Sequence, residues 1–256
     1  MALEDLIGLG IVATFLGFAA VETLWPARVF PASAYWKTRG LIGFVLLMGL
    51  NTLLPPLWDG WFGAHRLLDA SGLGTLGGAL YGFLVLELGV YVWHRLMHRT
   101  PVLWRAFHQM HHSAERVDIW GAAYFHPLDM IGFSCLFSFT LIMVAGVAPE
   151  AAIIANLTAT FYSFFQHANV RTPRWLGYII QRPESHSLHH ERGVHAYNYS
   201  DLPLWDIVFG TFRNPAVWQG RAGFHDGASL RIGAMLVGAD VGEARTPPAT
   251  SSRLTA

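Results

Sequence analysis

Long apolar stretches without charge constrain this chain more than any other feature of its sequence. Three of them, residues 6–21, 41–58 and 73–93, approach or reach the ~20 residues that a helix needs to cross a bilayer. Only the third contains a charged residue, Glu87. Glu4 and Asp5 precede the first stretch, where a secretory signal would carry Lys or Arg, so we expect a retained membrane span there.

Two further uncharged stretches, residues 130–147 and 151–165, follow one another closely. Only Ala148, Pro149 and Glu150 separate them, which predicts a tight helical hairpin whose shorter arm either crosses the bilayer or only enters it. Together the five stretches predict an all-α fold, an integral-membrane helical bundle. We expect one domain over residues 1–225, followed by a polar, flexible tail over residues 226–256.

The composition excludes several classes of protein. Hydrophobic residues make up 53% of the chain and charged residues only 13%, against roughly 25% in a typical soluble domain. Lys and Arg together number 17, as do Asp and Glu, so the chain has no net basic field that would attract nucleic acid. A single cysteine, Cys135, excludes an intrachain disulfide and a cysteine-ligated iron–sulfur cluster.

Positive charge predicts how the chain is oriented in the membrane, because Lys and Arg gather in cytoplasmic loops. Basic residues lie between the first two stretches, after the third and after the fifth: Arg28, Lys37 and Arg39; Arg95, Arg99, Arg105 and Arg116; Arg171, Arg174 and Arg182. Alternating passes of five segments place all three of these regions on one side. We therefore expect a helical cap on the cytoplasmic side of the bundle.

Histidine is unusually frequent, with 13 residues, and eight of them form three clusters. The clusters are His94-Arg-Leu-Met-His98, His108-Gln-Met-His111-His112 and His186-Ser-Leu-His189-His190. Residues three and four apart share a face of a helix, so we expect each cluster to point all its imidazoles in one direction. All three clusters fall in regions predicted to be cytoplasmic, and they can converge there.

A metal centre explains these clusters better than scattered, hydrogen-bonded histidines do. Eight neutral imidazoles gathered without a cation would leave many polar nitrogens poorly paired. One ion accepts about four to six ligands, so the number of imidazoles predicts two ions. Iron, zinc, copper and nickel all suit imidazole, and ligand type alone leaves these alternatives open.

The histidine clusters resemble the HRxxH, HxxHH and HxxHH boxes of the fatty acid hydroxylase/sterol desaturase superfamily of integral-membrane di-iron oxygenases. Three further elements are similar to the family pattern: Phe125-His126-Pro127-Leu128-Asp129; Gln166-His167-Ala168-Asn169; and Leu204-Trp205-Asp206 with Phe209-Gly210-Thr211. The resemblance covers roughly residues 73–214 in the same order. The first two apolar stretches are similar only in being hydrophobic.

The resemblance implies a di-iron centre with nine histidine ligands and no catalytic residue apart from them. Zinc can replace iron in purified material, since it also binds imidazole. The ligands implied by the resemblance are His94, His98, His108, His111, His112, His186, His189 and His190, with His167 as the ninth. Candidates for supporting groups around them are Glu87, His126, Asn169 and His195.

Glu87 admits two interpretations, because a carboxylate inside an apolar span is costly and faces the bundle interior. Residues 87, 91, 94 and 98 form one stripe along a helix. In one interpretation Glu87 accepts a hydrogen bond from a ligand imidazole. In the other it is paired with an arginine and serves the packing of helices. For His126 a structural role is favoured, and for His195 lining of the site and solvent exposure are equally expected. Trp205 and Asp206 are expected to anchor the C-terminal segment.

The sequence therefore predicts an O2-dependent enzyme that hydroxylates or desaturates a membrane lipid, with a fatty acyl or sterol-like substrate. No GxSxG or P-loop pattern indicates another chemistry. The chain lacks a flavin or cluster motif, so the electrons must come from a separate ferredoxin- or cytochrome-type protein. The alternative is a membrane protein that binds or transports metal, which would usually place its ligands along a path through several spans.

Overall fold

The computed structural model describes residues 3–243, and apart from an isolated bridge between Glu191 and Ala222 its regular elements in that range are helical. The all-α prediction is confirmed. The longer helices are α1 (Leu3–Leu24), α2 (Trp36–Leu53), α4 (Gly74–Arg99), α7 (Pro127–Ser138) and α8 (Pro149–His167). The short helices are η1 (Pro55–Leu57), α3 (Asp59–Ala64), η2 (Ser71–Leu73), α5 (Pro101–Leu103), η3 (Trp104–His108), α6 (Gln109–His112), η4 (Gly121–Ala123), η5 (Phe139–Val144), η6 (Arg174–Tyr178), α9 (Pro183–His189), α10 (Pro203–Val208), η7 (Ala228–Leu230) and α11 (Ile232–Leu236).

Four helical segments are long and apolar enough to cross a membrane: Ile7–Leu24, Trp36–Leu57, Ser71–Arg99 and Pro127–Val144. Their number and hydropathy support an integral membrane protein. The fifth expected segment forms α8, which is not among these four because polar residues such as Glu150, Asn156 and Gln166 lower its mean hydropathy. Helix α8 nevertheless returns the chain to the end of the bundle that carries the cap.

Helices α4 and α8 pack closely through small side chains. Ala79, Ala155 and Ala159 are buried in one cluster with Leu86 of α4. A Cβ atom added at Gly78 would lie 3.0 Å from the Cβ atom of Ala151. Small residues allow membrane helices to approach one another, so this contact holds the C-terminal end of α4 next to that of α8.

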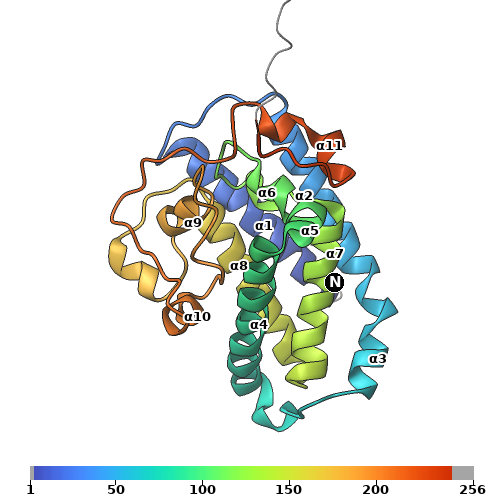
Figure 1. Cartoon of the computed structure of the whole chain (residues 1–256). Coiled ribbons are helices and arrows are strands. Elements are labelled where there is room, and N and C mark those ends of the chain that lie inside the picture. The colour runs from blue at the N-terminus through green and yellow to red at the C-terminus, as the bar shows by residue number, and fades with distance from the viewer. Residues whose placement is uncertain (1–2, 244–256) are drawn as a thin grey trace, which may run out of the picture.

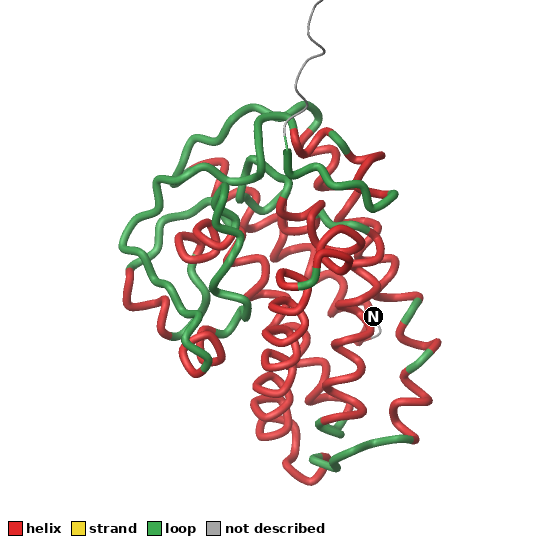
Figure 2. Tube along the Cα trace, viewed as in Figure 1, coloured by secondary structure: helices red, strands yellow, loops and turns green. Residues whose placement is uncertain are grey.

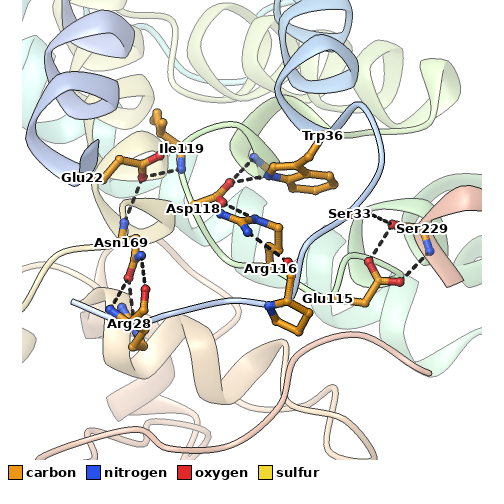
Figure 3. A network of polar contacts seen from close by, with 12 residues as sticks. Glu22, Arg28, Ser33, Trp36, Glu115, Arg116, Asp118, Ile119, Asn169 and Ser229 are labelled. Atoms are coloured by element: carbon orange, nitrogen blue, oxygen red, sulfur yellow. Dashed lines mark hydrogen bonds and ion pairs between the residues drawn. The ribbon is translucent and has the colours of Figure 1, made fainter. Parts of the chain in front are cut away.

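Helices α1 and α2 are joined to the cap by aromatic and polar contacts. Phe15 of α1 stacks on Phe44 of α2 with ring centroids 4.3 Å apart. The Glu22 carboxylate accepts hydrogen bonds from the backbone N–H groups of Ile119 (2.9 Å) and Asn169 (3.2 Å), as Figure 3 shows. These contacts tie the N-terminal spans to segments that lie near the histidines.

A cap of short helices and long loops covers one end of the bundle (Figures 1 and 2). Helices α5, α6, α9 and α11 gather there. Helix α4 ends before the cap because Pro101 follows Thr100, and the residue before a proline avoids the helical conformation; Thr100 has φ −115° and ψ 107°. The fold therefore contains the expected cap, and the side of the membrane on which it lies stays a prediction.

The segment after residue 225 departs from the flexible tail that the sequence predicted. Met235 and Val241 are fully buried in a cluster with Trp36 and Met110, and the Gln109 side-chain amide donates to the Ala239 carbonyl oxygen at 2.8 Å. Residues 226–243 are thus packed on the cap through Ala228, Met235 and Val241, while Leu230, Leu236 and Val237 stay exposed. Residues 244–256, the Pro-, Ser- and Thr-rich end, lie outside the described range.

Candidate metal centre

Four segments bring the predicted histidines together at the cap end of the bundle. His94 and His98 lie on the last turns of α4, and His167 is the last residue of α8. The middle cluster spans η3, which is a π-helical turn, and α6; the third cluster lies on α9 and the residue after it. Eight of the nine side chains are buried and His98 is partly exposed.

The nine imidazoles form two groups in which the ligand atoms lie within 4.8 Å of one another. The first group contains His94, His98, His108, His112 and His189, and the second contains His111, His167, His186 and His190. The sequence-based expectation that each cluster points all its imidazoles one way is therefore wrong for the second and third clusters.

The geometry of a helix explains this division. In the second cluster, His108 and His112 are four residues apart and share the first group, whereas His111 joins the second group. In the third cluster, His186 and His190 share the second group, whereas His189 joins the first. Adjacent residues of a helix point about 100° apart. The residue three positions after the first histidine and the residue four positions after it therefore lie on opposite sides of that histidine, and they face different centres.

In the first group, ring nitrogens converge on one point. The His94 Nε2 atom lies 3.1 Å from His98 Nε2, 2.9 Å from His108 Nε2 and 3.0 Å from His189 Nε2. The Nε2 atom of His112 is buried and has no hydrogen-bond partner in the described part of the chain. One ring nitrogen has one proton or one lone pair, so it cannot form three good hydrogen bonds at once.

The second group repeats this arrangement. The His167 Nε2 atom lies 3.1 Å from His111 Nε2 and 3.0 Å from His186 Nε2, which in turn lies 3.0 Å from His190 Nε2. The groups also touch each other, because the His112 and His190 rings stack with centroids 4.0 Å apart and an interplanar angle of 10°.

The partners of the Nδ1 atoms determine which ring nitrogens carry protons. Backbone carbonyl oxygens accept hydrogen bonds from the Nδ1 atoms of four of the nine histidines, as follows: His94 to Tyr199 (2.7 Å), His98 to His195 (2.9 Å), His167 to Ser163 (2.7 Å) and His189 to Tyr197 (2.7 Å). A carbonyl oxygen can only accept, so each of these Nδ1 atoms carries the proton. The Nε2 lone pairs are therefore free to face the centre of each group.

These lone pairs fit a cation. Burial keeps the imidazoles neutral: it lowers the pKa of His186, His189 and His190 well below the usual value, and neighbouring imidazoles lower each further. Neutral lone pairs about 3 Å apart repel one another unless a positive ion lies between them. Two nitrogens that bind one ion at about 2.0–2.1 Å and at right angles are about 3 Å apart, which is the spacing observed.

A carboxylate that sequence reasoning did not single out as a supporting group holds one of the histidines. The Nδ1 atom of His108 donates to Asp129 Oδ2 at 2.7 Å, and both side chains are buried. Such a carboxylate fixes the tautomer of a ligand imidazole and increases its basicity. The sequence signal was Asp129 at the end of the Phe125–Asp129 element, on the first turn of α7.

Glu87 does neither of the things that its position in the sequence suggested. Its Oε2 atom accepts hydrogen bonds from Ser200 Oγ (2.8 Å) and the Leu202 backbone N–H (2.9 Å), and in the described residues it pairs with neither a histidine nor an arginine. The contact is with the loop that supplies the Tyr199 carbonyl to His94. Asp206 clamps the same loop by accepting from the Tyr199 and Ser200 backbone N–H groups, each at 2.9 Å.

The other expected supporting groups differ in outcome. His195 contacts the site, because its carbonyl oxygen accepts from His98 and its Nδ1 atom lies 3.0 Å from His112 Nδ1. His126 instead accepts at Nδ1 from the Leu128 backbone N–H and caps α7.

Asn169 binds Arg28. Its Oδ1 atom accepts hydrogen bonds from the Arg28 backbone N–H at 3.0 Å and from Arg28 Nε at 3.3 Å. Neither His126 nor Asn169 makes a hydrogen bond to the nine histidines within residues 3–243. Trp205 and Asp206 anchor the C-terminal segment as expected, with Trp205 Nε1 donating to the Leu84 carbonyl oxygen at 3.1 Å.

Comparison with known proteins gives the same family as the histidine spacing. The chain is 34% identical over 139 residues to an ornithine lipid hydroxylase of Rhizobium tropici, covering 52% of this chain and 41% of that protein. It is 27% identical over 133 residues to sphinganine C4-monooxygenase 1 of Arabidopsis thaliana, covering 50% and 51%. It is 31% identical over 134 residues to alkylglycerol monooxygenase of Danio rerio, covering 51% and 29%.

The chain thus spans about half the length, or less, of these curated relatives. Among solved structures, none matches the chain. Residues 79–211, more than half of the chain, match the family described as fatty acid hydroxylase, and this stretch includes all nine histidines of the two groups. The chain therefore belongs to the fatty acid hydroxylase family.

Proposed function

We propose that this protein is a membrane oxygenase that inserts oxygen into a C–H bond of a lipid, using two iron ions held by the nine histidines. The observation that carries the proposal is the pair of imidazole groups, five and four in number, with lone pairs converging at about 3 Å. When bound, the two ions would supply the reduction of O2 to an oxidant that attacks an unactivated C–H bond.

The residues of this chain do the remaining work by positioning and by exclusion of water. Asp129 and the carbonyl oxygens of residues 163, 195, 197 and 199 orient the imidazoles. Burial of the ligands keeps bulk water away from the site. His94 and His98 lie at the cap end of a candidate membrane span, Ser71–Arg99, and this position close to the end of an apolar span supports a lipid substrate.

Hydroxylation is the outcome we favour over desaturation. Both reactions begin with removal of hydrogen from a carbon atom. The relatives named above are hydroxylases or monooxygenases of an ornithine lipid, sphinganine and an alkylglycerol, which supports hydroxylation of a lipid that carries a polar headgroup. We further propose that the cap faces the cytoplasm, on the arginine distribution, and that a separate ferredoxin- or cytochrome-type protein supplies the electrons.

A metal-transport function is the second candidate, and the placement of the ligands argues against it. A transport path needs sites distributed across the membrane, whereas both groups lie together at one end of the bundle and their rings stack.

Lipid mass spectrometry tests the proposal. Lipids from cells that express the protein should contain a species heavier by one oxygen atom, absent from cells that express His189→Ala. Loss of two hydrogen atoms would show desaturation. The iron content of the protein is measured after purification from the same cells, which must also contain a reductant. An unchanged lipid profile in cells that meet both conditions would contradict an oxygenase function.

A further inference from the structure

Two adjoining cavities open on the cap, away from the histidine groups. The first has a volume of about 340 Å³ and the second about 450 Å³, both within the range of small-molecule sites. Arg28, Trp218 and Gln219 line both cavities, so the two adjoin at these residues, and we refer to them together as the groove. Neither cavity is lined by any of the nine histidines.

The groove is rich in arginine. Arg192 and Arg221 line the first cavity, Arg171 lines the second, and Arg28 lies between them. Two carboxylates also line the groove, but each already has partners. Glu115 accepts from the Ser229 N–H and hydroxyl, and Glu184 accepts from Thr172 and lies 3.1 Å from Arg182 Nη2. Asp226 pairs with Arg192 and Arg221 at the outer edge.

Two arginine donors of the groove remain unused. The Arg28 Nη2 and Arg192 Nε atoms are buried and have no hydrogen-bond partner within the described range. Burial also lowers the pKa of Arg28; Glu184 opposes this shift, and Arg171 and Arg182 add to it. A partly buried guanidinium with an unpaired N–H and further arginines nearby is stabilised by an anion that accepts two hydrogen bonds.

One wall of the groove comes from the loop between two candidate membrane spans. Arg28 follows the candidate span Ile7–Leu24 by four residues, and the next candidate span begins at Trp36. Trp218 is 7% exposed and places its ring 5.6 Å from the Arg28 guanidinium, which gives the groove an aromatic wall. Phosphate groups of lipids lie just outside the apolar core of the bilayer, where a loop between two spans emerges.

Arg28 also connects the groove to the histidine groups. Its Nη1 atom donates to Ser187 Oγ at 2.8 Å, and Ser187 lies directly after His186 on α9. Asn169, which follows His167 by two residues, accepts from the Arg28 backbone N–H and donates to the Arg28 carbonyl oxygen at 2.8 Å (Figure 3). An anion held by Arg28 would therefore be fixed relative to two segments that carry members of the second group.

We propose that this groove binds a phosphate-class oxyanion, through Arg28 and Arg192 with Arg171 and Arg221 at its edges. Its wall from the loop between two candidate membrane spans favours the phosphate of a lipid headgroup as the source, with free phosphate as the alternative. The groove contains none of the nine histidines, so binding of an anion to it can be measured without any oxidation of lipid.

Calorimetric titration of the detergent-purified, metal-loaded full chain tests this proposal with two probes, inorganic phosphate and dihexanoyl phosphatidic acid. The test variant is Arg171→Gln/Arg192→Gln. The matched control is Arg174→Gln/Arg213→Gln, which removes the same charge from exposed cap residues that do not line the groove. Arg28→Lys keeps the charge and removes the planar fork.

The test variant should raise the Kd of the bound probe roughly tenfold or more, as expected for losing hydrogen bonds to a charged group, while the control changes it by less than about twofold. Arg28→Lys should also weaken binding. Tighter binding of the phosphatidic acid than of phosphate identifies a lipid headgroup, and equal binding identifies free phosphate.

Absence of binding in the unmodified protein, or equal loss in the test and control variants, overturns the proposal. Metal content is measured in every sample. A groove that binds the probes in a protein without lipid oxidation would contradict the oxygenase function and leave the oxyanion site standing.

Discussion

The Nδ1 atom of His108 and the Oδ2 atom of Asp129 lie 2.7 Å apart, and both side chains are excluded from solvent. This pair joins the middle histidine cluster to the first turn of α7, a helix that supplies no histidine to either group. Asp129 is thus a buried carboxylate that holds a candidate metal ligand in place.

Asp129→Asn should therefore weaken metal binding. The amide can still accept a hydrogen bond, but it no longer stabilises the polarised imidazole, and changes of this kind cost about 10–100-fold in metal affinity. Competition between the protein and a chelator for Fe²⁺ measures the change. Glu87→Gln is the comparison, because Glu87 contacts Ser200 and Leu202 and, within residues 3–243, hydrogen-bonds to no imidazole. A larger loss in Glu87→Gln than in Asp129→Asn would show that the loop at residues 199–202 matters more than the carboxylate.

Removal of one histidine from each group should affect one ion at a time. His189→Ala belongs to the group of five and His111→Ala to the group of four. Each variant is expected to lose lipid turnover and to contain about one ion per chain in place of about two. Elemental analysis and circular dichroism separate metal loss from unfolding.

His65→Ala serves as the control for these variants, because His65 is exposed and stacks on Trp61 away from both groups. Substantial turnover in His189→Ala or His111→Ala would remove that residue from the ligand set.

Metal removal should destabilise the cap. Without ions, the converging Nε2 lone pairs repel one another, and an ion that binds only the folded protein stabilises it by about 2.7 kcal/mol at a concentration one hundred times its Kd. Thermal unfolding before and after chelation measures this difference, and added Fe²⁺ should restore the original Tm. An identical Tm for the loaded and stripped protein would argue against metal ions at these positions.

The contact between α2 and the cap should depend on the absence of a side chain at Gly43. A methyl group there would overlap the Ala123 carbonyl oxygen, so Gly43→Ala must displace α2 or η4. We expect a loss of about 1–3 kcal/mol in stability, read as a lower Tm of the metal-loaded protein. Gly49→Ala lies on the same helix, where the structure places nothing within 4 Å of the added atom, and it should leave the Tm unchanged or raise it slightly, because alanine favours a helix more than glycine does. A Tm of Gly43→Ala that is not lower than that of Gly49→Ala would mean that helix propensity, and not the contact, dominates.

Much of this protein follows from the linear pattern of its residues. Apolar stretches of sufficient length can only be buried in lipid or in one another, so the all-α class and the spans near α1, α2, α4 and α7 are local properties of the chain. The spacing of the histidines is local as well. The three clusters hold eight imidazoles, more than one ion can bind, and so predict a centre of two ions before any contact is known.

Partnerships between distant residues could be decided only by the tertiary structure. The separation of His111 from His108 and His112, and of His189 from His186 and His190, depends on how α6 and α9 are rotated against α4 and α8. Glu87 lies on the histidine stripe of α4 yet binds the loop at residues 200–202, while Asp129 of α7 reaches His108. Periodicity places a side chain on a face of its own helix, but the hydrogen-bond partner across that face is set by the packing of other segments.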